Sequence, residues 1–256
     1  MSKYDEHIEN VDKYLRGRQV REFNCPPSVD DLKKDLPVQV GPRSNPGIIL
    51  RSDMFAELGN PAEGSSGFIV WTEDTSLVRD GRITLIGPDI PDLEGASVPF
   101  GQVLMIAGEK LDTEVQERIE EYQHISDYLE GYMVRSSSQS IWGRVSKDSV
   151  AKGFNMEILG KALMINMKSN VPEIEAMEVV FVTSNKDDVK QLGEIAVEVD
   201  DVRKDIIKAV WKERGYDLDC DLDCNSCESK VTCDDIRDII RAQKEKGTAE
   251  IGGSEG

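Results

Sequence analysis

Four of the five cysteines are crowded into a short stretch near the C-terminus, with the spacing C-x3-C-x2-C-x5-C. They are Cys220, Cys224, Cys227 and Cys233. A metal site of this type needs about four soft thiolates that converge on one centre. The two-residue spacer lets Cys224 and Cys227 approach the same centre from one tight turn. In a reducing compartment such a cluster indicates metal ligation and not disulfide bonds.

The sequence constrains the ligands of this site more tightly than the metal. Four cysteines without a histidine fit a [4Fe-4S] cluster and also a zinc ion. Structural zinc sites with four thiolates usually carry two C-x2-C knuckles, and this segment has one. We therefore favour an iron–sulfur cluster, with zinc as the alternative and a metal-free segment as the third possibility.

A second candidate site lies on the apolar run Ser140–Ser146, where side chains alternate across an expected strand. Trp142 and Arg144 then share one face, and a helix is expected to begin at Lys147. Trp142 offers a ring on which an adenine can stack. Arg144, Lys147 and Arg135 offer positive charges to phosphates, which helix N-termini and the carboxyl ends of strands also attract. The structural alternative is that Trp142 packs beneath a helix and Arg144 pairs with an acidic neighbour.

Short apolar runs bounded by turn residues predict the strands that would position this site. They are Gly67–Thr72, Arg82–Gly87, Gln102–Ala107, Ser140–Ser146 and Met177–Thr183. Apolar residues at three- and four-residue steps predict helices over Asp112–Val134, Asn155–Ser169 and Lys186–Arg214, the last with Ser184 as its N-cap. Because strands and helices alternate, we expect an α/β fold with a mostly parallel sheet covered by helices, followed by a small C-terminal cysteine-ligated metal segment.

This reading divides the chain into four parts. Residues 1–45 are expected to form a helical arm, broken by prolines, and residues 46–214 the α/β domain. Residues 215–246 would be the four-cysteine metal-binding segment. The last part, residues 247–256, is rich in Gly and Glu and is expected to be disordered.

The composition of the 256-residue chain limits its partners and its location. A net charge of −18 argues against nucleic acid and anionic membrane surfaces, because both attract clustered Lys and Arg. No apolar run approaches the roughly 18 residues of a membrane helix, and the N-terminus lacks the apolar core of a signal peptide. We therefore expect a cytoplasmic protein that binds neither nucleic acid nor membrane. No catalytic residue is assigned, because the sequence holds no Ser/His/Asp set, Walker loop or G-x-G-x-x-G fingerprint.

Four stretches of the α/β region resemble a known family. They are MFAELGNP at Met54–Pro61, ITLIGPDI at Ile83–Ile90, AGEKLD at Ala107–Asp112 and, most distinctive, IWGRVSKDSVAKGF at Ile141–Phe154. Through them, residues 38–192 resemble the non-catalytic α/β domain of the acetyl-CoA synthase family, also called the acetyl-CoA decarbonylase/synthase β subunit.

The resemblance implies a ligand and a limit on activity. In that family this domain precedes a catalytic domain with a nickel–iron–sulfur centre, and coenzyme A is bound near a tryptophan among arginines. Coenzyme A is therefore the implied ligand of Trp142 and Arg144. The later C-G-C element that holds the second nickel is missing from this sequence. We therefore expect that this chain alone is not a complete acetyl-CoA synthase.

Together these observations predict an accessory or truncated iron–sulfur subunit of an acetyl-CoA-synthase-like, CO dehydrogenase-related complex of anaerobic one-carbon metabolism. Such a subunit would dock other protein subunits, with a ferredoxin or a corrinoid protein as candidate partners, and would bind coenzyme A or acyl-CoA. One alternative is an electron-transfer or scaffold subunit of an anaerobic enzyme complex. A second alternative is a zinc-stapled interaction module, that is, a protein-binding segment whose fold is held together by a structural zinc ion.

Overall fold

The computed structural model describes residues 2–34, 36–41, 48–122, 129–137 and 139–213. Met1–Arg203 forms one compact unit and Lys204–Gly256 a second. The metal-binding segment and the tail that we predicted over residues 215–256 lie outside the described residues. Within the described ranges, no helix is long and apolar enough to cross a membrane.

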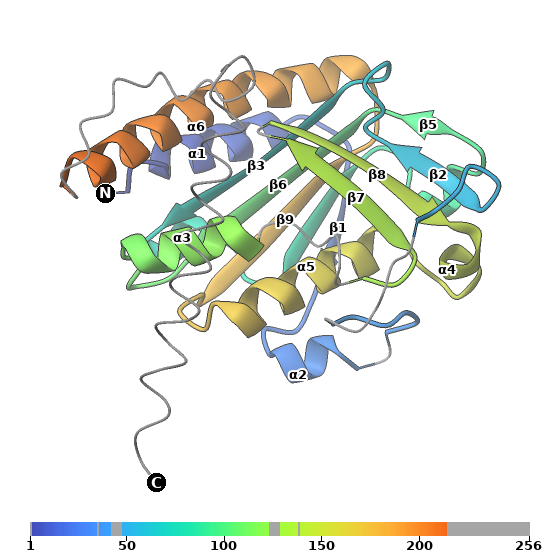
Figure 1. Cartoon of the computed structure of the whole chain (residues 1–256), viewed down its shortest axis with the longest axis horizontal. Helices are drawn as coiled ribbons and strands as arrows, with labels where there is room; N and C mark the ends of the chain where they lie inside the picture. Colours follow the sequence, from blue (N-terminus) through green and yellow to red (C-terminus); the bar gives the residue numbers. More distant parts are fainter. Residues whose placement is uncertain (1, 35, 42–47, 123–128, 138, 214–256) are drawn as a thin grey trace, which may run out of the picture. The chain divides into compact units, whose positions relative to one another are not determined.

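Two sheets form the framework of the first unit (Figure 1). The five-stranded sheet has the order β1-β4-β9-β6-β3, from β1 (Val20–Asn24), β4 (Arg82–Ile86), β9 (Ala176–Val182), β6 (Phe100–Ala107) and β3 (Ser65–Thr72). The four-stranded sheet has the order β5-β2-β8-β7, from β5 (Ser97–Val98), β2 (Met54–Leu58), β8 (Ser140–Ser146) and β7 (Tyr132–Ser137).

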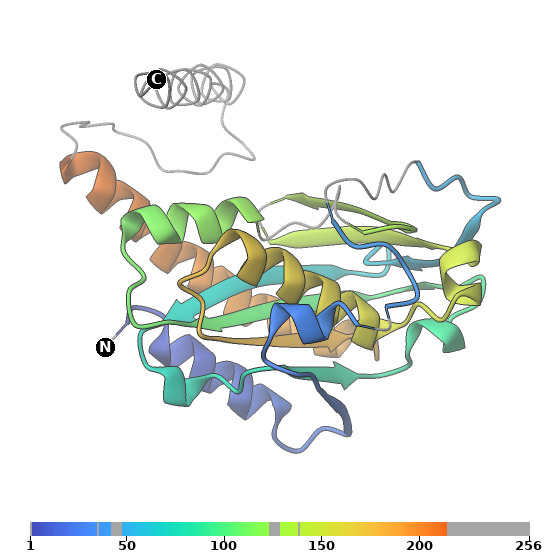
Figure 2. The ribbon, with the colours of Figure 1, turned by 90° about the horizontal axis from the view of Figure 1, so that it is seen from below.

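Helices cover both faces of the five-stranded sheet (Figure 1 and Figure 2). On one face lie α1 (Asp5–Leu15) and the part of α6 (Lys186–Glu213) that belongs to the first unit. On the other lies α5 (Met156–Asn170), which contacts α2 (Val29–Leu32) and α3 (Thr113–Tyr122). The short helices are α4 (Lys147–Ala151), η1 (Thr75–Leu77) and η2 (Ile90–Asp92).

Our prediction of a mostly parallel sheet is wrong, because both sheets are mixed. In the larger sheet β3–β6 and β4–β9 are parallel, whereas β1–β4 and β6–β9 are antiparallel. The direction changes because β9 starts beside the end of β6, where the amide of Glu175 donates to the carbonyl of Ala107 at 2.9 Å. Both strands are buried on both faces. Their unbroken apolar runs therefore carry no signal of direction.

The five predicted strands are confirmed, and the bounds predicted for Ser140–Ser146 are those of β8. The predicted helix after Asn155 is α5, and the Asn155 side chain accepts the amide of Ile158 at 2.9 Å. The long helix α6 begins at Lys186 as predicted. Its capping contact comes from Asn185 and not from Ser184, because Asn185 Oδ1 accepts the amide of Asp188 at 2.9 Å.

The predicted helix Asp112–Val134 is wrong at its C-terminal end, where residues 129–134 form a turn and the start of a strand. Helix α3 ends at Tyr122, and strand β7 begins at Tyr132. The turn before β7 uses Gly131, whose φ of 72° is in the left-handed region that favours glycine. Within β7, Tyr132 and Val134 are both buried, which is the two-residue period of a strand. The apolar spacing of so short a strand also matches part of a helical pattern.

The four-stranded sheet packs against the five-stranded sheet through β8, which contacts β3 and β6. The amide of Gly67 in β3 donates to the carbonyl of Gln139 at 2.9 Å. A Cβ at Gly67 would lie 3.2 Å from the side chain of Ile141, so the two layers approach closely here. One face of the smaller sheet is thus buried against the larger one, and its other face is left for the candidate site.

Candidate functional site

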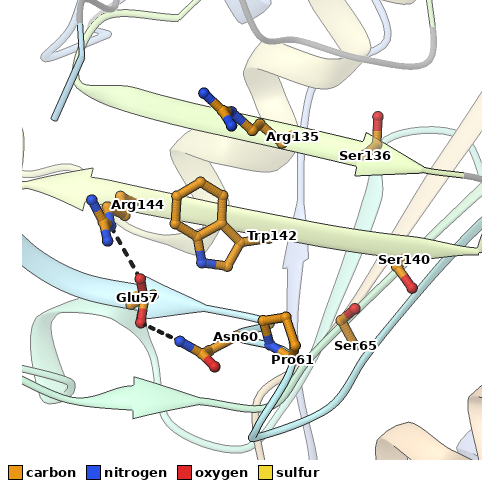
Figure 3. Close-up of a pocket in the computed structure, with 10 residues that line it drawn as sticks. Glu57, Asn60, Pro61, Ser65, Arg135, Ser136, Ser140, Trp142 and Arg144 are labelled. Carbon is orange, nitrogen blue, oxygen red and sulfur yellow. Dashed lines mark hydrogen bonds and ion pairs between the residues drawn. The ribbon is translucent and has the colours of Figure 1, made fainter.

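A pocket of about 880 Å³ lies on the face of the four-stranded sheet that turns away from β3 and β6 (Figure 3). This volume is within the range of small-molecule sites. Strands β7 and β8 supply Arg135, Ser136, Ser140, Trp142 and Arg144, and β2 with the turn after it supplies Glu57, Gly59, Asn60 and Pro61. Ser65 of β3 completes the lining. We call this the Trp142 pocket.

Strand β8 positions the tryptophan by simple alternation. Ile141, Gly143 and Val145 point to the buried side, while Trp142 and Arg144 are half-buried on the pocket side. The predicted alternation is therefore confirmed. On the buried side, a Cβ at Gly143 would lie 2.9 Å from the ring of Tyr132. A glycine at this position lets β8 pass over that ring.

The turn after β2 brings the remaining pocket residues into place. Gly59 has a φ of 69°, and a Cβ there would lie 2.1 Å from the carbonyl oxygen of Ile141. A larger residue would clash with the backbone of β8, so glycine is required on two counts. The chain then turns through Asn60 and Pro61 along the pocket (Figure 3).

Glu57 and Arg144 form an ion pair at one end of the pocket. They are cross-strand partners of β2 and β8, with Arg144 Nε 3.1 Å from Glu57 Oε1. Asn60 Nδ2 and Ser97 Oγ also donate to Glu57, at 2.8 and 3.2 Å. Burial alone would raise the pKa of the Glu57 carboxyl, but the hydrogen bonds from Asn60, Arg144 and Ser97 hold its pKa below the usual range. Glu57 is therefore ionised at neutral pH.

The indole of Trp142 lies beside the guanidinium group of Arg144 and across from a second arginine. The Cζ atom of Arg144 is 4.9 Å from the centroid of the Trp142 ring, a cation–π distance. Arg135 is the cross-strand partner of Trp142 on β7, and it is exposed. Figure 3 shows Arg135 and Arg144 toward one end of the pocket, and Ser65, Ser136 and Ser140 toward the opposite end.

The structure brings together two of the three cofactor-binding residues predicted from the sequence. Trp142 and Arg144 share the pocket, whereas Lys147 does not line it and donates to the carbonyl of Ser52 at 2.8 Å. The pocket lies along the first half of β8 and at the carboxyl ends of β2 and β7, and not at the carboxyl end of β8 where the sequence placed it. Of the structural alternatives, the acidic partner of Arg144 is present, but Trp142 lines a pocket.

Sequence reasoning missed Glu57 and Asn60, and it did not predict strand β7, which carries Ser136. One signal was available for Glu57. It is the only charged residue in the strand-like run MFAEL, and it is 8% exposed. A charge is seldom buried in a strand without a partner. Such a residue therefore predicts a nearby cation, which here is Arg144.

The four predicted metal ligands, Cys220, Cys224, Cys227 and Cys233, lie outside the described residues. In the ranges that the structure does describe, no group of three or more His, Cys, Asp or Glu side chains could hold a metal ion. Cys25 is a buried free cysteine, and burial raises the pKa of its thiol to about 11. It is therefore a packed apolar group and not a reactive thiolate.

Comparison with known proteins gives consistent matches over the part of the chain that holds the pocket. The Acetyl-CoA decarbonylase/synthase complex subunit beta of Archaeoglobus fulgidus is 33% identical over 199 residues, covering 76% of this chain and 37% of the relative. Subunit beta 2 of the same complex from Methanosarcina mazei is 32% identical, covering 77% and 42%. The Carbon monoxide dehydrogenase/acetyl-CoA synthase subunit alpha of Moorella thermoacetica is 32% identical, covering 77% and 27%.

The chain thus spans roughly two fifths or less of the length of these relatives. A family model also matches residues 36–189, a range that contains every residue lining the Trp142 pocket. The family resemblance inferred from the sequence is confirmed: the chain belongs to the CO dehydrogenase/acetyl-CoA synthase complex beta subunit family.

Proposed function

We propose that this chain is a non-catalytic subunit of an acetyl-CoA-synthase-type complex, and that its Trp142 pocket binds coenzyme A or an acyl-coenzyme A. The observation that carries the proposal is a half-buried indole in a pocket of about 880 Å³, with the Arg144 guanidinium beside the ring and Arg135 directly across from it on β7. Coenzyme A combines an adenine, which stacks on aromatic rings, with phosphates, which arginines bind.

The charge distribution supports an anionic ligand at this place. The chain as a whole has a net charge of −18, which repels polyanions from most of its surface. In the Trp142 pocket the balance is reversed, because Arg135 and Arg144 face a single acidic side chain, Glu57. The pocket is therefore a local basic region on an acidic protein.

We further propose that Cys220, Cys224, Cys227 and Cys233 hold a [4Fe-4S] cluster, on the strength of their number and spacing. The cluster would let the subunit store or relay an electron. The printed names of the relatives describe subunits of complexes, which supports docking to other protein subunits. A ferredoxin and a corrinoid protein are the partners to test first.

Calorimetric titration with coenzyme A tests the ligand. Wild-type protein should bind, and Trp142→Ala should lose most of the affinity, because base–aromatic stacking is removed. Trp211→Phe is the matched control, since Trp211 lies in α6 and does not line the pocket. Absence of heat with wild-type protein at millimolar coenzyme A would contradict the proposal and favour an electron-transfer or scaffold subunit.

Metal analysis of protein purified without oxygen tests the cluster. We expect about four irons per chain and the broad visible absorption of an iron–sulfur protein. Stoichiometric zinc without iron, after expression in iron-replete anaerobic cells, would instead identify a zinc-stapled interaction module.

A further inference from the structure

The two arginines of the Trp142 pocket differ in whether a carboxylate of the protein compensates their charge. Arg144 Nε donates to the carboxylate of Glu57 at 3.1 Å, and Arg144 Nη1 donates to the carbonyl of Ile49 at 3.2 Å. The Cζ atom of its guanidinium lies 4.9 Å from the centroid of the Trp142 ring. Its side chain is 24% exposed and that of Glu57 is 11% exposed. A ligand that took Arg144 away from this position would leave a carboxylate with little access to water, which is costly.

Glu57 is held as firmly as Arg144. Besides Arg144, it accepts hydrogen bonds from Asn60 and Ser97, which come from the turn after β2 and from β5. Three donors on one carboxylate favour its ionised form. The charge of Arg144 is therefore compensated within the protein, and the pair contributes little net attraction for an anion.

Arg135 has no such partner. In the described part of the chain its side chain makes no hydrogen bond or ion pair, and its guanidinium is exposed. Glu57, the acidic residue that lines the pocket, is bound to Arg144. Arg135 also stands directly across from Trp142, and directly opposed residues of neighbouring strands have Cβ atoms about 4.5–5.5 Å apart. A ring stacked on Trp142 therefore brings an attached phosphate within reach of Arg135.

We propose that Arg135 is the anion-binding residue of the Trp142 pocket, whereas Arg144 is a positioning residue that Glu57 holds against the indole. The assignment rests on the proposed binding of coenzyme A and goes further, because it separates the phosphate contact from the stacking platform. The ligand class it names is a purine whose nearest phosphate is recognised by one free arginine on β7. The sequence alone offered Arg144, Lys147 and Arg135 together as phosphate contacts and did not separate their roles.

The test compares coenzyme A with adenosine, which has the base but no phosphate, by Trp142 fluorescence in the full chain. Trp142→Phe serves as the signal control, because Trp71 and Trp211 also emit. Arg135→Gln should weaken coenzyme A binding about 10-fold to 100-fold, as expected for a lost charge-assisted contact, and should leave adenosine binding unchanged. It should also remove most of the salt dependence of coenzyme A binding, because salt screens exposed charges.

The Glu57→Gln/Arg144→Gln double variant is the counterpart, because it removes both charges of the pair and keeps the net charge of the pocket. It should alter the emission maximum of the unliganded indole, weaken coenzyme A and adenosine by the same small factor, and keep the salt dependence. The single variant Arg144→Lys retains a cation near the ring. The emission maximum of its unliganded indole should therefore lie between those of the double variant and the wild type.

The possible outcomes separate the two proposals. A double variant that loses the salt dependence, together with an Arg135→Gln variant that binds coenzyme A like wild type, would overturn the assignment of the arginines but not the ligand. Wild-type protein that binds neither coenzyme A nor adenosine would overturn the proposed function and this assignment with it.

Discussion

At the scale of single residues, the most unusual group of the core is the carboxyl of Glu178. It is fully buried in β9, and Arg82 Nε donates to its Oε1 at 2.6 Å. Asp12 of α1 contacts the same arginine at 3.4 Å. Burial raises the pKa of Glu178 to about 7, although Arg82 opposes the shift. The native protein therefore holds a proton on this group at pH values where the unfolded chain has released it.

This difference predicts a specific pH dependence of stability. Because the folded-state pKa is raised, stability from Glu178 is present below its unfolded pKa of about 4.3 and is lost as pH rises to about 7. Glu178→Gln mimics the protonated form and should abolish this loss, which amounts to at most about 4 kcal/mol at about 1.4 kcal/mol per pKa unit. Urea unfolding of both proteins between pH 4.5 and pH 7.5 measures the difference.

Glu173 provides a control of opposite sign. A hydrogen bond from Arg118 lowers the pKa of its carboxyl, so its contribution is present at neutral pH and is lost as pH falls. Glu173→Gln should therefore reduce stability at neutral pH and not in acid. Identical pH profiles for wild type and Glu178→Gln would show that Arg82 keeps the buried carboxylate ionised.

At the scale of elements, two helical glycines illustrate how closely the layers pack. A Cβ at Gly160 of α5 would lie 2.5 Å from the Cδ1 atom of Ile83, which is fully buried in β4. A Cβ at Gly193 of α6 would meet only Ser66 Oγ at 3.9 Å, an ordinary contact. The first glycine sets the distance between helix and sheet, and the second does not.

Alanine at each position should therefore have opposite effects. Gly160→Ala overpacks the interface with β4 and should cost about 1–3 kcal/mol. Gly193→Ala should stabilise by about 0.5–1 kcal/mol, because alanine has the higher helix propensity and meets no obstacle. Thermal unfolding of both variants measures the contrast. Equal stabilisation by both would mean that α5 can move away from the sheet without cost.

Sequence patterns predicted the elements that are buried on both sides and failed where a segment is short or half-exposed. The runs that became β4 and β9 are continuous and apolar, so they could be found. Strand β1 was missed, because Val20–Asn24 is mostly exposed and pairs at the edge of the sheet. The direction of these strands could not be predicted either, since buried parallel and antiparallel strands have the same composition.

The candidate site was predicted in part for a similar reason. Alternation along β8 places Trp142 and Arg144 on one face without knowledge of the fold. The partners Glu57 and Arg135 come from two other strands, and it is the registers of these strands with β8 that place Glu57 opposite Arg144 and Arg135 opposite Trp142. Register between strands is a tertiary property, so the roles of the two arginines could not be separated in advance.

At the scale of the whole molecule, the folded unit is larger than the segment that matches the family. The match covers residues 36–189. Residues before it nevertheless complete the core, because Tyr4 packs against Trp71 with ring centroids 4.7 Å apart and β1 pairs with β4. Ile8 and Val11 of α1 are also fully or almost fully buried. The N-terminal segment that we expected as an arm thus contributes to the α/β core.

The C-terminal cysteines, by contrast, are expected to act independently of this core. The buried core residues of the described chain lie between Tyr4 and Val199, all before Cys220. Cys224→Ser combined with Cys227→Ser should therefore remove the iron, since two of four thiolate ligands are lost. The main thermal transition and the coenzyme A affinity should stay as in wild type.

Cys25→Ser is the matched control for the cysteine variant, because it changes a thiol that packs in the core. It should keep the iron and lower stability by about 1–3 kcal/mol, since a hydroxyl replaces a buried group with little access to water. Iron analysis and differential scanning calorimetry on the same samples separate the two effects.

Iron retained after the double replacement would contradict the cluster assignment. Loss of the main transition in that variant would show instead that metal binding and the α/β fold are coupled, because the energy of a metal–thiolate site then contributes to folding of the whole chain.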